Sequence, residues 1–144
     1  MIIVYILGAL IVAASVYAAV AYNLLVAAKN TVNAAWSDVE VQVKRRYDLV
    51  PNLVSAVKAY AEHESSVIEN AVKARTAAMS AQGGADERYS AEKNLSAALK
   101  SLIAVSEKYP ELKASENFLK LQFELTDIED RIKASRRFYN TNVM

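Results

Sequence analysis

The first 28 residues carry no charged side chain, and this feature constrains the fold more than any other in the sequence. Lys29 is the first charged residue, so the uncharged stretch exceeds the roughly 20 apolar residues that cross a bilayer core of about 30 Å. Tyr5, Tyr17 and Tyr22 lie towards its ends, where amphipathic rings favour the membrane–water interface. We therefore expect residues 1–28 to form an N-terminal transmembrane anchor.

A cleaved signal peptide is the alternative interpretation of this segment. Ala19-Val20-Ala21 has the small residues of a cleavage site. However, no basic region precedes the apolar stretch, and the stretch is longer than the apolar core of a signal peptide. These two features favour a retained anchor.

Basic residues lie on one side of the predicted span. Only the α-amino group precedes it, whereas Lys29, Lys44, Arg45 and Arg46 follow it. Segments rich in Lys and Arg stay in the cytoplasm, so we expect a single-pass protein with its N-terminus outside and the rest cytoplasmic.

The remaining residues, 29–144, have the composition of one all-α domain. The chain has only three Gly and two Pro, and no run of alternating apolar and polar residues indicates a strand. Its length allows one domain. We expect an antiparallel four-helix bundle continuous with the transmembrane helix.

Three sequence breaks predict where the helices end. Asp48 and Pro51 are typical of a new first turn, Gly83 and Gly84 form the only glycine pair, and Pro110 ends a helix before a cap at Ser115. The expected helices are about 22–47, 49–81, 87–108 and 115–142.

The last predicted helix shows the clearest apolar periodicity. Its apolar positions alternate spacings of three and four, which predicts a coiled-coil-like seam. They are Phe118, Leu121, Leu125, Ile128, Ile132, Ser135 and Tyr139.

Neither catalytic nor metal-binding chemistry is indicated. Cysteine is absent, which excludes thiolate sites, and His63 is the only histidine. Its neighbours Glu62 and Glu64 point to other faces of a helix, so we assign His63 to a solvated surface. Gly83-Gly84 lacks the features of a phosphate loop. A net charge of +1 gives no reason to expect nucleic-acid binding. We expect no enzyme activity, cofactor or metal.

A polar stripe borders the predicted seam. Gln122, Glu129 and Arg136 recur every seven residues. Such a stripe usually fixes the register of helices at a half-buried edge, and a docking surface for another helix is the alternative.

A second polar cluster lies at the predicted membrane-distal turn. It consists of Arg45, Arg46, Tyr47, Asp48, Pro51 and Asn52. We interpret it as a turn stabilised by Asp48, with a partner site as the alternative. Arg46 falls on the apolar side of its helix, and we consider an internal ion pair with Glu64.

Helix lengths suggest how the bundle meets the membrane. If the span ends near Ala21, about 26 residues protrude, roughly 39 Å, and the next helix returns roughly 50 Å. The Gly83-Gly84 turn would then reach the membrane surface and bring cations to anionic headgroups. These cations are Lys73, Arg75, Arg88 and Lys93. The alternative is a tilted bundle whose basic residues face water.

Three motifs resemble the signature of the LemA family. They are residues 35–54 (AWSDVEVQVKRRYDLVPNLV), residues 109–119 (YPELKASENFL) with Leu121-Gln122 and Glu124-Leu125, and residues 136–140 (RRFYN). Family members usually continue past the last motif with a further Tyr-Asn and a Phe-Pro stretch. Either this protein is shorter or a tail follows Met144.

The resemblance implies a single-pass protein of the bacterial inner membrane with a cytoplasmic helical bundle, and it implies no reaction. We expect a scaffold whose partners are the lipid bilayer, an unidentified protein and further copies of itself. Small residues four apart in the span, Ala9 with Ala13 and Ala14 with Ala18, favour such a homo-oligomer. The alternatives are a protein that shapes or senses membranes through the Gly83-Gly84 end and, third, a ligand-binding bundle.

Overall fold

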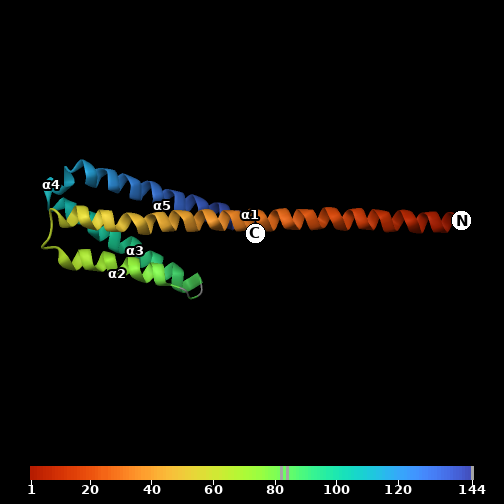
Figure 1. Cartoon of the computed structure of the whole chain (residues 1–144), viewed down its shortest axis with the longest axis horizontal. Coiled ribbons are helices and arrows are strands. Elements are labelled where there is room, and N and C mark those ends of the chain that lie inside the picture. The colour runs from red at the N-terminus through yellow and green to blue at the C-terminus, as the bar shows by residue number, and fades with distance from the viewer. Residues whose placement is uncertain (82, 84, 144) are drawn as a thin grey trace. The chain divides into compact units, whose positions relative to one another are not determined.

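A computed structural model describes residues 1–81, 83 and 85–143, and the described part contains helices and no strand (Figure 1). The elements are α1 (Ile2–Lys58), α2 (Ser65–Ser80), α3 (Ala85–Ala104), the 3₁₀ helix η1 (Val105–Glu107), α4 (Pro110–Lys113) and α5 (Glu116–Val143). The predicted all-α fold class is confirmed.

The chain divides into two units, which we describe separately. Unit 1 comprises Met1–Val39 and Ala134–Met144, and unit 2 comprises Glu40–Lys133. The sequence analysis divides the chain elsewhere, at the end of the uncharged segment after residue 28. That division into an anchor and a bundle stays a prediction.

Unit 2 is a helical bundle with one apolar core. It contains the last part of α1, all of α2, α3 and α4, and the first part of α5. Apolar residues spaced three and four apart fall on one face of each helix and are buried there. The side chains with at most 1% exposure include Val50, Leu53 and Val57 on α1, Leu95, Leu99 and Leu102 on α3, Leu112 on α4 and Phe118 on α5. Full burial of each such side chain contributes roughly 1.5–3 kcal/mol.

The predicted helix boundary at residues 48–51 is wrong. Helix α1 continues through Pro51 to Lys58. Proline has no N–H, so Pro51 leaves the carbonyl of Tyr47, four residues earlier, without its helical partner. The side chain of Arg75 replaces that donor, since its Nε donates to the Tyr47 carbonyl oxygen over 2.7 Å. A contact from α2 therefore compensates for the proline, and the helix continues.

The connection between α1 and α2 consequently lies later than predicted, at residues 59–64. Ala61 is buried in the core within this connection, whereas His63 is exposed, as expected for a solvated residue. The predicted turn at Gly83-Gly84 is described only at Gly83, because Gln82 and Gly84 lie outside the described residues.

The last two predicted boundaries lie close to those observed. Pro110 occupies the first turn of α4. The backbone N–H of Phe118 donates to Ser115 Oγ over 3.5 Å, so Ser115 caps α5 as predicted. The expected helices at 87–108 and 115–142 correspond to α3 with η1 and to α5.

In unit 1, most side chains in the first part of α1 are not packed against other residues of the unit. Between residues 1 and 34 every side chain is exposed except Ala21 and Val32, which are half-buried. This helix is long and apolar enough to cross a membrane, with a mean hydropathy of 2.4 over its most apolar stretch. Further along α1, the ring of Trp36 packs against the ring of Tyr139, with the two centroids 5.2 Å apart.

We predict that Arg75 and Pro51 are energetically coupled. Arg75→Met should lower the free energy of unfolding by about 1–3 kcal/mol, because it leaves the Tyr47 carbonyl without a donor. In a Pro51→Ala background the restored N–H should bond that carbonyl, and the cost of Arg75→Met should fall by at least about half. Urea unfolding of the four proteins gives the coupling, and equal costs in both backgrounds would contradict this account.

Candidate functional site

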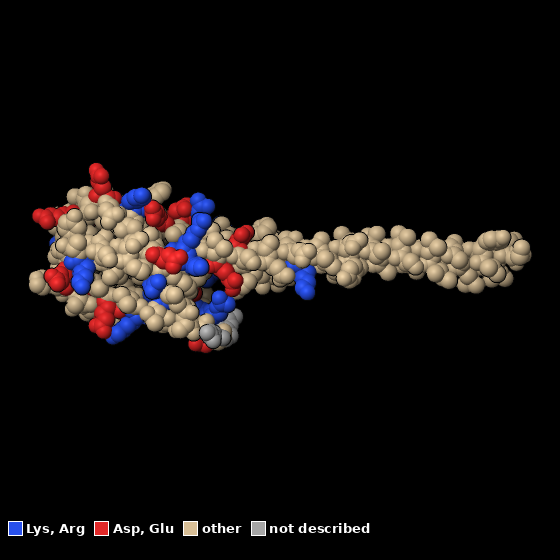
Figure 2. Space-filling view, viewed as in Figure 1, with Lys and Arg blue, Asp and Glu red and all other residues tan. Residues whose placement is uncertain are grey.

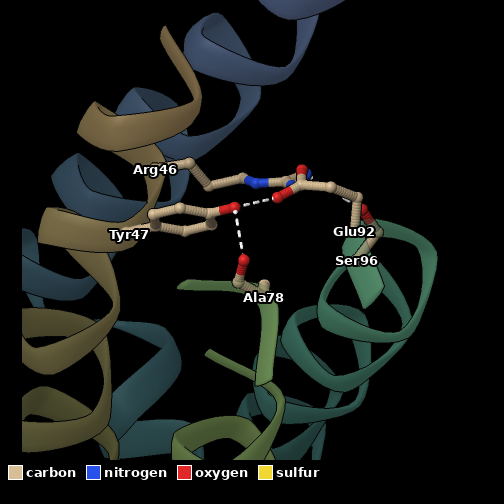
Figure 3. A network of polar contacts seen from close by, with 5 residues as sticks. All are labelled: Arg46, Tyr47, Ala78, Glu92 and Ser96. Atoms are coloured by element: carbon tan, nitrogen blue, oxygen red, sulfur yellow. Dashed lines mark hydrogen bonds and ion pairs between the residues drawn. The ribbon is translucent and has the colours of Figure 1, made fainter. Parts of the chain in front are cut away.

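An ion pair lies inside unit 2, between α1 and α3. Arg46 and Glu92 have relative exposures of only 4% and 8%. Arg46 Nη2 donates to Glu92 Oε2, and Arg46 Nη1 donates to Ser96 Oγ over 3.0 Å (Figure 3). Two buried charges thus neutralise each other within a mostly apolar core.

The helical periodicity of both segments explains why these charges meet. Arg46 lies four residues before Val50 on the buried face of α1, and Glu92 lies three residues before Leu95 on the buried face of α3. Each charge therefore occupies a position that the seam would normally give to an apolar residue. The sequence analysis did not identify Glu92, although its position three residues before Leu95 on the apolar face of α3 could have indicated a buried acid.

Tyr47 joins the same network. Its hydroxyl lies within hydrogen-bonding reach of two acceptors, Glu92 Oε1 and the carbonyl oxygen of Ala78, the latter at 3.3 Å (Figure 3). Burial raises the pKa of the Tyr47 phenol above its ordinary value of 10, and the hydrogen bond and negative charge of Glu92 raise it further. The hydroxyl therefore stays a neutral donor throughout the physiological range.

Two buried polar atoms near this network have no hydrogen-bond partner among the described residues. They are Arg46 Nε and Gln42 Oε1, which lie one helical turn apart on α1. One is a donor and the other an acceptor. The ion pair is therefore incompletely satisfied, a condition that reduces its contribution to stability.

The internal ion pair considered between Arg46 and Glu64 is not formed. The partner of Arg46 is Glu92, and Glu64 contacts two other residues instead. Tyr109 donates to Glu64 Oε1 over 3.4 Å, and Lys108 Nζ lies 3.7 Å from the same oxygen.

The residues predicted to form a membrane-distal turn lie within helix α1, so that prediction is wrong. Arg46 and Tyr47 enter the buried network, whereas the other four side chains are exposed. These four are Arg45, Asp48, Pro51 and Asn52. Three of them border an open groove of about 380 Å³, lined by Arg45, Asp48, Leu49, Asn52, Glu124, Asp127 and Ile128.

The predicted stripe along α5 is half-buried. Gln122, Glu129 and Arg136 each have intermediate exposure, Gln122 and Glu129 in unit 2 and Arg136 in unit 1. Whether the stripe sets register or docks a partner stays a prediction.

Of the four cations predicted to meet headgroups, three contact other residues of the protein. Lys73 Nζ lies 2.7 Å from Glu69 and Arg88 Nη2 lies 3.8 Å from Glu40, both in exposed pairs. Arg75 is half-buried and donates to the Tyr47 carbonyl. Lys93 is exposed.

The geometry of the network indicates a structural role, in which it joins α1 to α2 and α3. Both oxygens of Glu92 accept hydrogen bonds, from Arg46 and from Tyr47, so this carboxylate has little freedom to act as a base. No group of three or more metal-binding side chains comes together in the described parts of the chain.

Comparison with known proteins agrees with this architecture. The LemA family model matches residues 35–144. This chain belongs to the LemA family. The family is membrane-associated, and the long apolar α1 is consistent with that property. The resemblance noted in the sequence is thereby confirmed.

Two relatives come from Paramagnetospirillum magneticum (strain ATCC 700264 / AMB-1). They are magnetosome protein MamQ 1 and magnetosome protein MamQ 2, each 26% identical to this LemA-family chain. Each alignment covers 83% of this chain and 53% of the relative. The chain thus spans about half the length of these relatives.

We predict that removing one charge of the ion pair lowers the free energy of unfolding more than replacing both charges with apolar residues. Glu92→Gln should lower the free energy of unfolding by about 3–5 kcal/mol, because Arg46 is left buried and uncompensated. The double substitution Arg46→Met with Glu92→Leu should recover most of this loss, since it removes both charges and keeps the volume. Urea denaturation followed by circular dichroism measures both. A double variant no more stable than Glu92→Gln would contradict the assignment.

We also predict that Tyr47 contributes to a fall in the free energy of unfolding at alkaline pH. Because the folded pKa of Tyr47 is raised above 10, the unfolded chain loses this proton first as pH rises. Stability from this group is therefore complete below about pH 10 and falls at higher pH. In Tyr47→Phe the decline in unfolding free energy between about pH 9.5 and 11.5 should be shallower, since one titrating group is gone. Tyr60→Phe, which removes an exposed tyrosine instead, serves as the control.

Proposed function

We propose that this LemA-family protein is a membrane-anchored scaffold without enzyme activity, which presents its helical bundle to protein partners. The observation that carries the proposal is the uncovered apolar segment of α1. Ile11, Leu24 and Leu25 are 67%, 67% and 70% exposed. In Figure 2 the N-terminal stretch of α1 is tan over the visible face up to the first blue side chain. A soluble protein rarely exposes so large an apolar surface, whereas lipid would cover it.

The proposed location is the bacterial inner membrane, with the N-terminus outside and the bundle in the cytoplasm. The exposed cations Lys29, Lys44 and Arg45 all follow the apolar segment, which supports this orientation. The MamQ relatives are bacterial and are named for the magnetosome, not for a reaction, in keeping with a non-enzymatic role.

Self-assembly is part of the proposal. The small side chains Ala9, Ala13, Ala14 and Ala18 are exposed, so a second span would find space to approach closely. The bundle would then be held at the membrane as a multivalent surface, which raises its effective affinity for partners.

The alternative role in shaping or sensing membranes through the Gly83-Gly84 end has weaker support. Arg75 is engaged by the Tyr47 carbonyl, and Arg88 lies beside Glu40. Lys73 and Lys93 are exposed, and Lys73 pairs with Glu69.

We predict that membrane attachment depends on the apolar character of α1. The full chain, expressed in a bacterium, should stay in the membrane fraction after high-salt and alkaline carbonate washes and dissolve only in detergent. Leu10→Lys with Ala14→Lys should release it, because two lysines near the centre of a span oppose insertion by about 5–7 kcal/mol. The matched control is Leu119→Lys with Phe123→Lys, which adds two lysines at exposed positions of α5 and should change nothing.

The same proteins then test the scaffold role. Amine crosslinking in intact cells should give discrete multimers of the wild type, and the variant with lysines in α1 should lose them. Removal of the wild type by salt alone would overturn the anchor. A strict monomer in detergent by light scattering, with no crosslinked species in cells, would overturn self-assembly.

A further inference from the structure

We propose that the tip of the α2–α3 hairpin is a flap that opens from α1 while the rest of the bundle stays folded. The flap consists of residues 72–81 and 85–94. A polar clasp formed by Arg46, Tyr47, Arg75, Glu92 and Ser96 holds it closed. This inference concerns movement within unit 2 and is independent of the proposed anchoring role.

The flap has almost no large apolar side chain in the core. Among its described side chains, Ala78 is the only hydrophobic residue that is fully buried. Its larger apolar residues face outward, with Val72, Met79 and Tyr89 at 45%, 53% and 64% exposure. Burial of an alanine contributes far less than burial of a leucine, so apolar packing holds the flap only weakly.

The other end of the same two helices is packed differently. Leu95, Leu99 and Leu102 on α3 have exposures of 0–1%, and Val67 and Ile68 on α2 pack against the same core. The change from apolar to polar packing along the hairpin therefore occurs near Ala71 on α2 and Leu95 on α3.

Polar contacts join the flap to a short stretch of α1, residues 40–47. Arg75 Nε donates to the Tyr47 carbonyl over 2.7 Å, and the Tyr47 hydroxyl lies 3.3 Å from the Ala78 carbonyl oxygen. Arg46 pairs with Glu92, and an exposed pair joins Arg88 to Glu40 over 3.8 Å. Figure 3 shows Arg46 and Tyr47 pointing from α1 towards the flap residues.

Such a clasp closes the flap with little net energy. Burying two charges costs desolvation energy, and their attraction offsets that cost only where all their hydrogen bonds are satisfied. Here Arg46 Nε and Gln42 Oε1 have no partner in the described part of the chain. Opening returns these groups to water, whereas opening the leucine-packed end exposes apolar surface. The flap should therefore open at a lower free energy than the core.

Thiol labelling tests this directly, because the chain has no cysteine. Ala78→Cys places one thiol under the clasp, and Ala71→Cys places one in the leucine-packed end. The two sites are matched, since both are on α2, seven residues apart on one face, with exposures of 7% and 0%. In the full chain in detergent micelles, an aqueous thiol reagent should label Ala78→Cys at least about tenfold faster than Ala71→Cys.

Breaking the clasp should make the flap open more readily. Glu92→Gln should speed labelling of Ala78→Cys by about a hundredfold or more, because it leaves Arg46 buried without its partner only while the flap is closed. Ser96→Ala removes one hydrogen bond to Arg46 and should give a smaller increase of about fivefold in the same direction, so the test survives if Glu92→Gln fails to fold. Glu69→Gln breaks the exposed pair with Lys73 and should alter neither rate.

Equal labelling rates at the two sites in the wild-type background would overturn the proposal. So would a clasp variant that leaves the labelling rate of Ala78→Cys unchanged while circular dichroism shows retained helix, because the clasp would then not hold the flap closed.

Discussion

The structure depends on the continuity of α1, a single helix of 57 residues that belongs to both units. It contains Pro51, a residue that normally ends or kinks a helix by removing a backbone donor and crowding the carbonyl four residues earlier. The guanidinium of Arg75 supplies the missing donor to that carbonyl, and the exposed Pro51 ring takes no space in the core. A tertiary contact thus keeps the last turns of α1, which carry the buried Leu53 and Val57, in one helix with the residues before Pro51.

The same short stretch of α1 supplies the buried charge. Arg46 is directed to Glu92, while the neighbouring Tyr47 uses its hydroxyl towards Glu92 and Ala78 and its carbonyl towards Arg75. An apolar pair of the same volume would stabilise the bundle at least as well, because it avoids the desolvation of two ions. The ion pair instead favours one register of α1 against α3, since a shift by one turn would leave both charges buried and unpaired.

Much of this bundle follows from the sequence alone, and the errors have identifiable causes. The apolar seam of α5 and the Ser115 cap depend on local periodicity, so they were predictable. The boundary at Pro51 was not, because its outcome depends on Arg75, 24 residues further along the chain. The true connection at residues 59–64 contains neither Gly nor Pro, and the chain turns there after the buried Val57 and Ala61. Glu92 was detectable as an acid at a seam position, but its partner required the arrangement of the helices.

One of the three motifs that resemble the LemA family, residues 35–54, contains several of these contacts. Pro51 leaves the backbone carbonyl of Tyr47 without its helical donor, and this carbonyl accepts a hydrogen bond from Arg75 instead. Arg46 pairs with Glu92 and thereby favours one register of α1 against α3. Arg46 and Tyr47 both bond Glu92, so substituting either one leaves this buried carboxylate with one partner fewer, whereas their neighbours Arg45 and Asp48 are exposed. These contacts lie where α1 meets the α2–α3 hairpin.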